Sequence, residues 1–157
     1  MTAQPIRIRL AERADIATLA ALRLDLFREL GRGEWFDERT FVETCRGAYA
    51  DVFAAGRGLA WLADSAEGPS VATLTLLVHS RMPSPRALAT SEGYITGVYT
   101  RPDWRRRGLA TELLRAATSA ARQHGLARVR LNATEQGREV YEKEGYVSRA
   151  SAMELSL

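Results

Sequence analysis

The residues best suited to chemistry stand in one stretch, residues 94 to 117, where a strand-like run leads through a basic turn into a helix. The first turn of a helix has four backbone N–H groups without an intrahelical partner, and the helix dipole adds about half a positive charge there. Gly108 precedes the helix and, lacking a Cβ, lets the backbone approach a ligand closely. We therefore predict a phosphate site at this helix N-terminus. Its extra positive charge would come from Arg105, Arg106 and Arg107.

Two plainer interpretations of the same turn stay open. Three arginines before a helix can be a solvated surface, and a single glycine can serve the turn alone. The stretch contains neither the G-x-x-x-x-G-K-[ST] pattern of a P-loop nor the G-x-G-x-x-G pattern of a dinucleotide-binding fold. An anion site here is thus predicted from the helix N-terminus, and not from either of those motifs.

The periodicity of apolar residues predicts the elements that must position this stretch. Glycines and polar runs mark the turns between them, as in DSAEGPS and SRMPSPRALATS. The predicted order is a strand over 6–11, helices over 15–29 and 37–55, a hairpin of strands 59–63 and 71–79, a loop over 80–91, a strand over 94–100, a helix from 109 to Gly125, a strand over 129–131, a helix over 136–144, and short strands at 146–147 and 153–155. This order is that of a mixed α+β fold.

Length and composition narrow the class of protein. The chain has 157 residues, of which 46% are apolar and 26% charged, which predicts one globular domain over residues 1–157. The net charge of +3 is too small to indicate nucleic-acid binding. A single cysteine, Cys45, excludes an internal disulfide and a cysteine-rich metal site. No apolar run approaches the roughly 20 residues that span a bilayer, and the N-terminus has no signal-peptide core, so we expect a cytoplasmic protein without a membrane partner.

Two segments together resemble the GNAT superfamily of N-acetyltransferases. Residues 98 to 114, VYTRPDWRRRGLATELL, match its strand–turn–helix motif Q/R-x-x-G-x-G/A as Arg105-x-x-Gly108-x-Ala110. Residues 140 to 146, VYEKEGY, are similar to its helix-ending Y-E-x-x-G-[FY] signature. The order of elements fits as well, so the resemblance covers the whole chain. It implies an α/β/α sandwich, with a mixed, mostly antiparallel sheet that splays at the cofactor site.

The resemblance implies acetyl-CoA as the cosubstrate and no metal. The backbone amides after the first motif residue would cradle the pyrophosphate, and the strand before the motif would pair with pantetheine, whose two amides need partners. Gly97 is expected to mark a β-bulge that opens this strand. Asn132 would hydrogen-bond the cofactor or substrate, although the family's usual asparagine is Thr134 here. The expected cofactor residues are Val98, Tyr99, Thr100, Arg105, Arg106, Arg107, Gly108, Leu109, Ala110, Thr111 and Asn132.

The implied reaction is acetyl transfer from the thioester to a primary amine through a tetrahedral intermediate, with backbone N–H from the Val98 region stabilising the oxyanion. Tyr141 stands where the family often has the acid that protonates the leaving thiolate, and it could instead simply pack in the core. Glu92 is the first candidate for the general base, and His79 the second. Either could also be an ordinary strand-end residue.

The amine acceptor is left open between a small molecule and a peptide. The two N-terminal helices, the loop between them and the 80–91 loop would form its site. Apolar walls would come from Trp35, Phe36 and Tyr94, and acidic attraction from Glu34, Asp37 and Glu38, unless those carboxylates only cap or solvate a helix. A non-catalytic acyl-CoA-binding or sensing module is the alternative function. A nucleic-acid partner is not expected, because aromatic residues do not alternate with the arginines. The resemblance also implies a possible homodimer, since dimers are common in the family.

Overall fold

The computed structural model describes residues 5–31, 36–149 and 151–157 of the chain. These described residues contain five strands: β1 (Ile6–Leu10), β2 (Gly58–Ser65), β3 (Ser70–Ser80), β4 (Ser91–Thr100) and β5 (Val129–Leu131). The same part of the chain contains four α-helices: α1 (Ile16–Glu29), α2 (Glu38–Ala54), α3 (Leu109–Gln123) and α4 (Arg138–Lys143). Short 3-10 turns precede α1 and follow β4, at Arg13–Asp15 and Pro102–Trp104.

The five strands form one sheet in the order β1-β2-β3-β4-β5. Neighbouring strands from β1 to β4 are antiparallel, whereas β5 is parallel to β4. That last ladder is short, because only residues 93–95 of β4 are paired with β5. The sheet is therefore mixed and mostly antiparallel, as expected.

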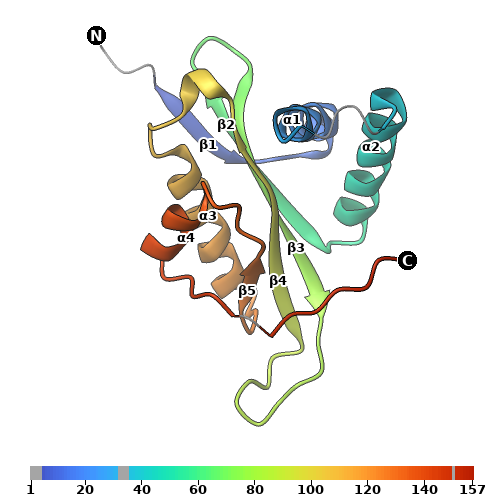
Figure 1. Cartoon of the computed structure of the whole chain (residues 1–157), viewed down its shortest axis with the longest axis vertical. Coiled ribbons are helices and arrows are strands. Elements are labelled where there is room, and N and C mark those ends of the chain that lie inside the picture. Colours follow the sequence, from blue (N-terminus) through green and yellow to red (C-terminus); the bar gives the residue numbers. More distant parts are fainter. Residues whose placement is uncertain (1–4, 32–35, 150) are drawn as a thin grey trace.

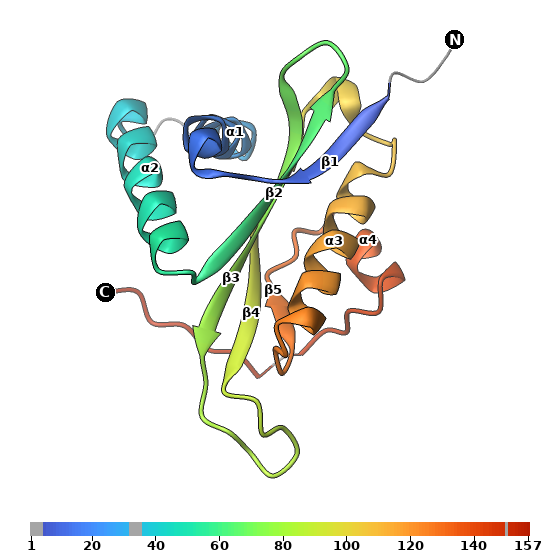
Figure 2. The ribbon, with the colours of Figure 1, turned by 180° about the vertical axis from the view of Figure 1, so that it is seen from behind.

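Helices cover both faces of the sheet. Figures 1 and 2 show α1 and α2 on one side and α3 and α4 on the other. Alternate strand residues face these two layers, and each layer has its own core. One core joins α3 to the sheet through Leu74, Leu76, Ile95, Leu113 and Leu114. The other joins α1 and α2 to the sheet through Leu19, Leu22, Tyr49, Ala60, Leu62 and Tyr99. The α/β/α sandwich is confirmed.

Helices α2 and α3 begin where their sequences predict, whereas α4 begins at Arg138, two residues later than predicted. Asp37 is the N-cap of α2, because its carboxylate accepts hydrogen bonds from the backbone N–H and the hydroxyl of Thr40. In α3 the residues buried against the sheet recur at helical spacing: Leu109, Leu113, Leu114, Ala117 and Ala121. Within the described residues, no helix has both the length and the apolar character to cross a membrane.

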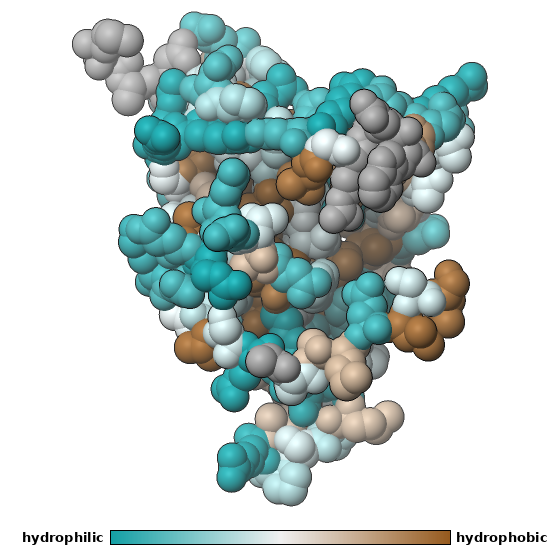
Figure 3. All heavy atoms as spheres, viewed as in Figure 1, coloured by the Kyte–Doolittle hydropathy of each residue, from teal (hydrophilic) through white to brown (hydrophobic). Residues whose placement is uncertain are grey.

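Two sequence predictions about strands were wrong. First, β3 extends to Ser80 and β4 begins already at Ser91, so the polar loop predicted over 80–91 is shorter than expected. Second, residues 146–147 and 153–155 are not strands. Tyr146 packs on the core under α3, whereas Val147 is 70%, Met153 99% and Leu155 83% exposed, and the alternating pattern has no described strand to pair with. In Figure 3 this face of the molecule is largely hydrophilic, with small hydrophobic patches.

Candidate active site

The turn between β4 and α3 adopts the left-handed backbone conformation twice. Gly108, the N-cap of α3, has a φ of 78°, and Arg106 has a φ of 58°. Glycine accepts this conformation readily, whereas an L-residue such as arginine adopts it rarely. A Cβ added at Gly108 would meet no atom within 4 Å, so the backbone angle and not crowding requires glycine in the free protein.

The backbone N–H groups of residues 106–111 lie in the turn and at the start of α3. The first backbone donor after the turn is the N–H of Glu112, which bonds the carbonyl of Gly108 at 3.0 Å. Within the described part of the chain, no hydrogen bond is recorded from the six N–H groups before it. These six are the amides predicted to hold a pyrophosphate, and they stand at the positive end of a 15-residue helix.

The arginine side chains of the turn differ in what they contact. Arg105 donates from Nε to the carbonyl of Thr100 at 2.9 Å and from Nη2 to Glu29 at 2.5 Å. The hydrogen bond from Arg105 lowers the pKa of the Glu29 carboxyl. Arg107 donates to the carbonyl of Asp103 at 3.0 Å, with its guanidinium 4.5 Å from the ring centroid of Trp104. Two of the three side chains are thus held by contacts within the protein. The backbone N–H groups are therefore the more direct hydrogen-bond donors to an anion.

Strand β4 carries a bulge at Gly97 and Val98. Thr96 is opposite Thr75 and Tyr99 is opposite Thr73, so two residues of β4 face the single residue Leu74 of β3. Gly97 has a φ of 64°, the left-handed conformation typical of the first residue of a glycine bulge. The bulge expected at Gly97 is therefore confirmed.

The outer edge of β4 is open beyond the bulge. Strand β5 pairs with β4 only as far as Ile95, and no described strand is paired with residues 96–100 on that side. Val98 packs against the core under α3, whereas Tyr99 is buried toward α1 and α2. One carbonyl of this edge, that of Thr100, already accepts a hydrogen bond from Arg105. The splay predicted for the sheet is present, and it leads directly into the turn that carries the amides of residues 106–111.

Tyr141 lies on α4 and packs against the same core cluster as Val98. Its ring centroid is 6.0 Å from that of Tyr146, in an edge-to-face arrangement. Burial raises the pKa of the Tyr141 phenol, and the neighbouring Tyr146 adds to this shift. The phenol is consequently protonated at neutral pH and could donate a proton.

Glu92 lies at the start of β4 among three arginines. Its carboxylate is 2.6 Å from Arg128, 3.7 Å from Arg81 and 4.0 Å from Arg130. Burial raises the pKa of Glu92, but the hydrogen bond and charges of the arginines outweigh it, and the pKa lies below its usual value. Glu92 is thus ionised but weakly basic. His79, opposite Glu92 on β3, is exposed.

Several other predicted residues are engaged in local structure. The Thr134 hydroxyl accepts a hydrogen bond from the N–H of Gly137 at 3.2 Å, just before α4. Asn132 is exposed after β5. Glu38 is held by Arg28 at 2.5 Å, and Phe36 packs on Phe41 with ring centroids 4.9 Å apart. The predicted acceptor residues Glu34 and Trp35 lie outside the described residues.

A polar cluster missed by sequence reasoning lies on the α1–α2 side of the bulge. Arg23 of α1 places Nη1 3.5 Å from the Thr96 hydroxyl. Tyr49 of α2 hydrogen-bonds Thr75 at 3.1 Å. The available signal was the position of Arg23 four residues after Leu19 and four before Phe27, on the otherwise apolar side of α1.

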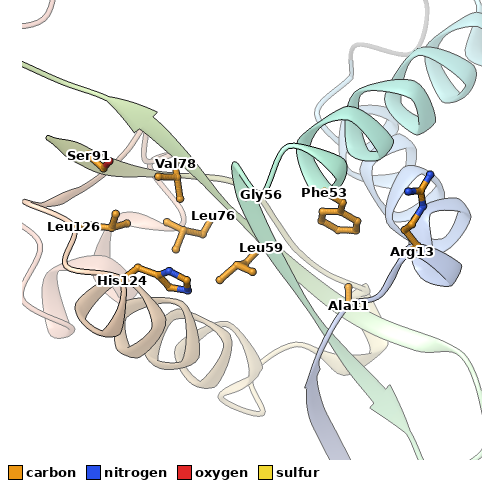
Figure 4. A pocket seen from close by; sticks show the side chains of 11 residues that line it. Ala11, Arg13, Phe53, Gly56, Leu59, Leu76, Val78, Ser91, His124 and Leu126 are labelled. Atoms are coloured by element: carbon orange, nitrogen blue, oxygen red, sulfur yellow. The ribbon is translucent and has the colours of Figure 1, made fainter.

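The structure also has an open cavity of about 510 Å³ elsewhere. Figure 4 shows it between the end of α2 and the end of α3, with Phe53 and Arg13 on one side and His124, Leu76 and Leu126 on the other. None of the predicted catalytic or cofactor residues lines it, although Phe53 and Ser91 belong to segments predicted to form the acceptor site. Among the residues that the structure describes, no group of three or more His, Cys, Asp or Glu is placed to hold a metal ion.

Comparison with known proteins gives the family. The model of the acetyltransferase (GNAT) family matches residues 22–146. A predicted acetyltransferase from Clostridium acetobutylicum, solved with acetyl-CoA, has a TM-score of 0.88 at 24% identity, over 97% of this chain and 96% of that one. A GCN5-related N-acetyltransferase from Ralstonia eutropha has a TM-score of 0.83 at 26% identity, over 98% and 99%. Glucosamine-6-phosphate N-acetyltransferase from Arabidopsis thaliana has a TM-score of 0.73 at 15% identity, over 98% and 99%. No curated protein matches the chain significantly.

Proposed function

Because this chain belongs to the acetyltransferase (GNAT) family, we propose that it transfers the acetyl group of acetyl-CoA to a primary amine of a small molecule or peptide. One observation carries the proposal furthest: the open edge of β4 leads into a turn whose six successive amides have no recorded acceptor. Such an arrangement offers a strand edge for an amide-containing arm and a helix N-terminus for its phosphates. Residues 1–157 would act as one catalytic domain.

Acetyl-CoA would bind mainly through backbone. The pyrophosphate would accept hydrogen bonds from the amides of residues 106–111, and the exposed Arg106 would add charge from its side chain. Pantetheine would run along Val98 and Tyr99, with Arg105 holding the carbonyl of Thr100 and so fixing the strand end. Asn132, exposed beyond β5, would contact the other side of the arm.

The bulge supports a role for Val98 in the chemical step. Gly97 turns the backbone out of the regular ladder, so the N–H of Val98 can point toward the thioester carbonyl and not into the sheet. The amine nitrogen would attack that carbonyl carbon and give a tetrahedral oxyanion, which the N–H would stabilise. Collapse of the intermediate breaks the C–S bond and releases the thiolate of CoA.

Two proton transfers complete the reaction. Tyr141 would protonate the leaving thiolate, since its phenol is protonated at neutral pH. Glu92 as the general base stays a prediction, and the three arginines around it weigh against that role because they lower its pKa. Nearby arginine charges would also lower the pKa of the bound ammonium, so that the amine loses its proton more readily. A homodimer likewise stays a prediction.

Acetyl-CoA binding and turnover test the proposal separately. Isothermal titration of the purified chain should show binding of acetyl-CoA, and release of CoA thiol should depend on added amine. Binding without amine-dependent release across a broad amine panel would instead favour the non-catalytic acyl-CoA module. Absence of binding would contradict both.

A further inference from the structure

The side chain of Arg23 ends at the β4 bulge. Besides its contact with Thr96, its Nη1 would lie 3.1 Å from a Cβ built on Gly97. Its guanidinium carbon is 5.2 Å from the ring centroid of Phe27. Arg23 is half-buried by α1, α2 and the sheet, and Thr96 and Gly97 beneath it are partly exposed. A ligand that reaches the bulge from this side would therefore meet the guanidinium.

Arg23 has no carboxylate partner among residues 5–31, 36–149 and 151–157. Eight other arginines among the described residues are paired with Asp or Glu: Arg9, Arg28, Arg39, Arg81, Arg105, Arg115, Arg128 and Arg130. Those without a recorded ion pair are exposed, apart from Arg101, which like Arg23 is half-buried. The recorded polar neighbours of Arg23 are uncharged hydroxyl and thiol groups of Thr96, Tyr49 and Cys45. A half-buried guanidinium has five N–H donors, and leaving it without an anion costs free energy.

The wider acceptor side also lacks the negative charge that a cationic acceptor would need. Glu92, Tyr94 and Thr96 share one face of β4, and Glu92 there is outnumbered by its three arginines. Asp37 is occupied in the N-cap of α2, and Glu38 in its pair with Arg28. Two further carboxylates near Tyr99, those of Asp25 and Glu29, are paired with Arg28 and Arg105. Each of these described carboxylates is thus already engaged with an arginine or a helix N-terminus.

We propose that the acceptor amine carries an anionic group, a carboxylate or a phosphate, which Arg23 binds. This inference rests on the proposed acetyl transfer, since Gly97 precedes the residue whose N–H would stabilise the oxyanion. Adjacent Cα atoms are about 3.8 Å apart, so the anion and the attacking nitrogen must be separated by only a few bonds. Amino acids and small amino phosphates fit this requirement. Polyamines, aminoglycosides and protein lysines do not, because they lack an anion close to the amine.

Matched acceptors that differ only in charge test the inference. CoA thiol release would be measured with glycine and glycinamide, L-alanine and L-alaninamide, L-phenylalanine and its amide, and phosphoethanolamine and ethanolamine. In the best pair, we expect kcat/KM to favour the anionic member by about tenfold or more, as for a hydrogen-bonded ion pair. The amino acid pairs test a carboxylate and the phosphoethanolamine pair tests a phosphate, so the results show which of the two anions the site prefers.

Variants of Arg23 link that preference to the side chain. Arg23→Gln should bring the ratio close to one by raising KM for the acceptor, with KM for acetyl-CoA unchanged, and Arg23→Lys should restore part of it. Arg39→Gln, on the exposed side of α2, is the control and should keep the full preference. Equal use of both members of every pair, or a preference that survives in Arg23→Gln, would overturn the inference.

A binding measurement separates this inference from the proposed function. The same pairs would be titrated into the wild type and Arg23→Gln with CoA present, which prevents turnover. If no amine releases thiol but anionic members still bind better in the wild type alone, the anion site stands and the transferase proposal fails. If titration shows no difference between members of any pair, the anion site is refuted even where acetyl transfer occurs.

Discussion

At the level of single residues, the arginines near the turn divide by what holds them. Arg105 is fixed by Glu29 and the carbonyl of Thr100, and Arg107 lies over Trp104. Arg106 is exposed, and the structure records no ion pair from it to a described residue. A run of three like residues therefore performs at least two tasks, and the sequence pattern alone does not separate them.

Tyr141→Phe should lower kcat by about a hundredfold or more, because proton donation by a positioned acid contributes roughly 10²–10⁴ in rate. Acetyl-CoA affinity should be unchanged, since the ring that packs in the core is kept. The measurements are steady-state thiol release and isothermal titration on the same preparation. Full turnover in the variant would remove Tyr141 from the mechanism and leave it a packing residue.

The pH profile gives a second sign of the same role. A tyrosine acid is active when protonated, and burial raises the pKa of Tyr141 above its ordinary value of about 10. Loss of kcat from its deprotonation should thus occur only on the alkaline side, above pH of about 10. A fall in wild-type kcat between pH 7 and 9 that also occurs in Tyr141→Phe would belong to another group.

Sequence reasoning succeeded at residues whose type is restricted by the backbone. Gly97 was singled out as a glycine inside a strand, and Gly108 as a residue without Cβ where the backbone would approach a phosphate, and both have positive φ. Arg23 escaped notice, because its meaning depends on contact with Thr96, 73 residues away in the chain. Whether a charged residue is paired with a carboxylate is a tertiary property that spacing along the helix does not reveal.

At the level of elements, the N-terminus of α3 is expected to donate hydrogen bonds to the phosphates of acetyl-CoA. Gly108→Glu should reduce acetyl-CoA affinity by at least about a hundredfold, since it places a negative charge at the helix start and since hydrogen bonds to charged groups are worth about 1.5–3 kcal/mol each. Arg107→Ala should reduce affinity less than about fivefold, because exposed charges contribute about 0–1 kcal/mol. Isothermal titration of both variants measures the contrast.

Equal losses from the two substitutions would mean that side-chain charge, and not the helix terminus, holds the phosphates. Gly108→Ala is the matched control for strain. It keeps the site uncharged but carries a cost of roughly 1–2 kcal/mol for a Cβ in the left-handed conformation. Its affinity should accordingly fall between those of the wild type and Gly108→Glu.

Elements with a buried side were predictable, and the C-terminal segment was not. Helix α3 has a regular apolar stripe that packs on β2 and β3, so its pattern and its environment agree. Residues 153–157 also alternate, with Met153, Leu155 and Leu157 apolar, yet they remain exposed. A strand needs a partner edge as well as alternation, and the sequence pattern carries only the second.

At the level of the whole molecule, binding of acetyl-CoA should raise the free energy of unfolding. Acetyl-CoA at about a hundred times its Kd adds about 2.7 kcal/mol to the free energy of unfolding. For a chain of this size we expect Tm to rise by about 5–11 °C in a single transition. Differential scanning calorimetry with and without ligand measures both. Two separated transitions would contradict a single domain over residues 1–157. At the same ligand concentration, a hundredfold loss of affinity in Gly108→Glu should reduce the rise to about 1–2 °C or less.

The bulge gives β4 one residue more than the facing part of β3. Removing Gly97 would leave Thr96 opposite Thr75 and Tyr99 opposite Thr73, with Val98 alone facing Leu74. The shortened strand would be a regular ladder, and every remaining side chain would keep its face. We expect the deletion protein to fold with undiminished Tm and to lose turnover. Natural relatives that lost this one residue would then keep the fold without the reaction. A deletion at this position in a related sequence would therefore indicate a protein that no longer catalyses acetyl transfer.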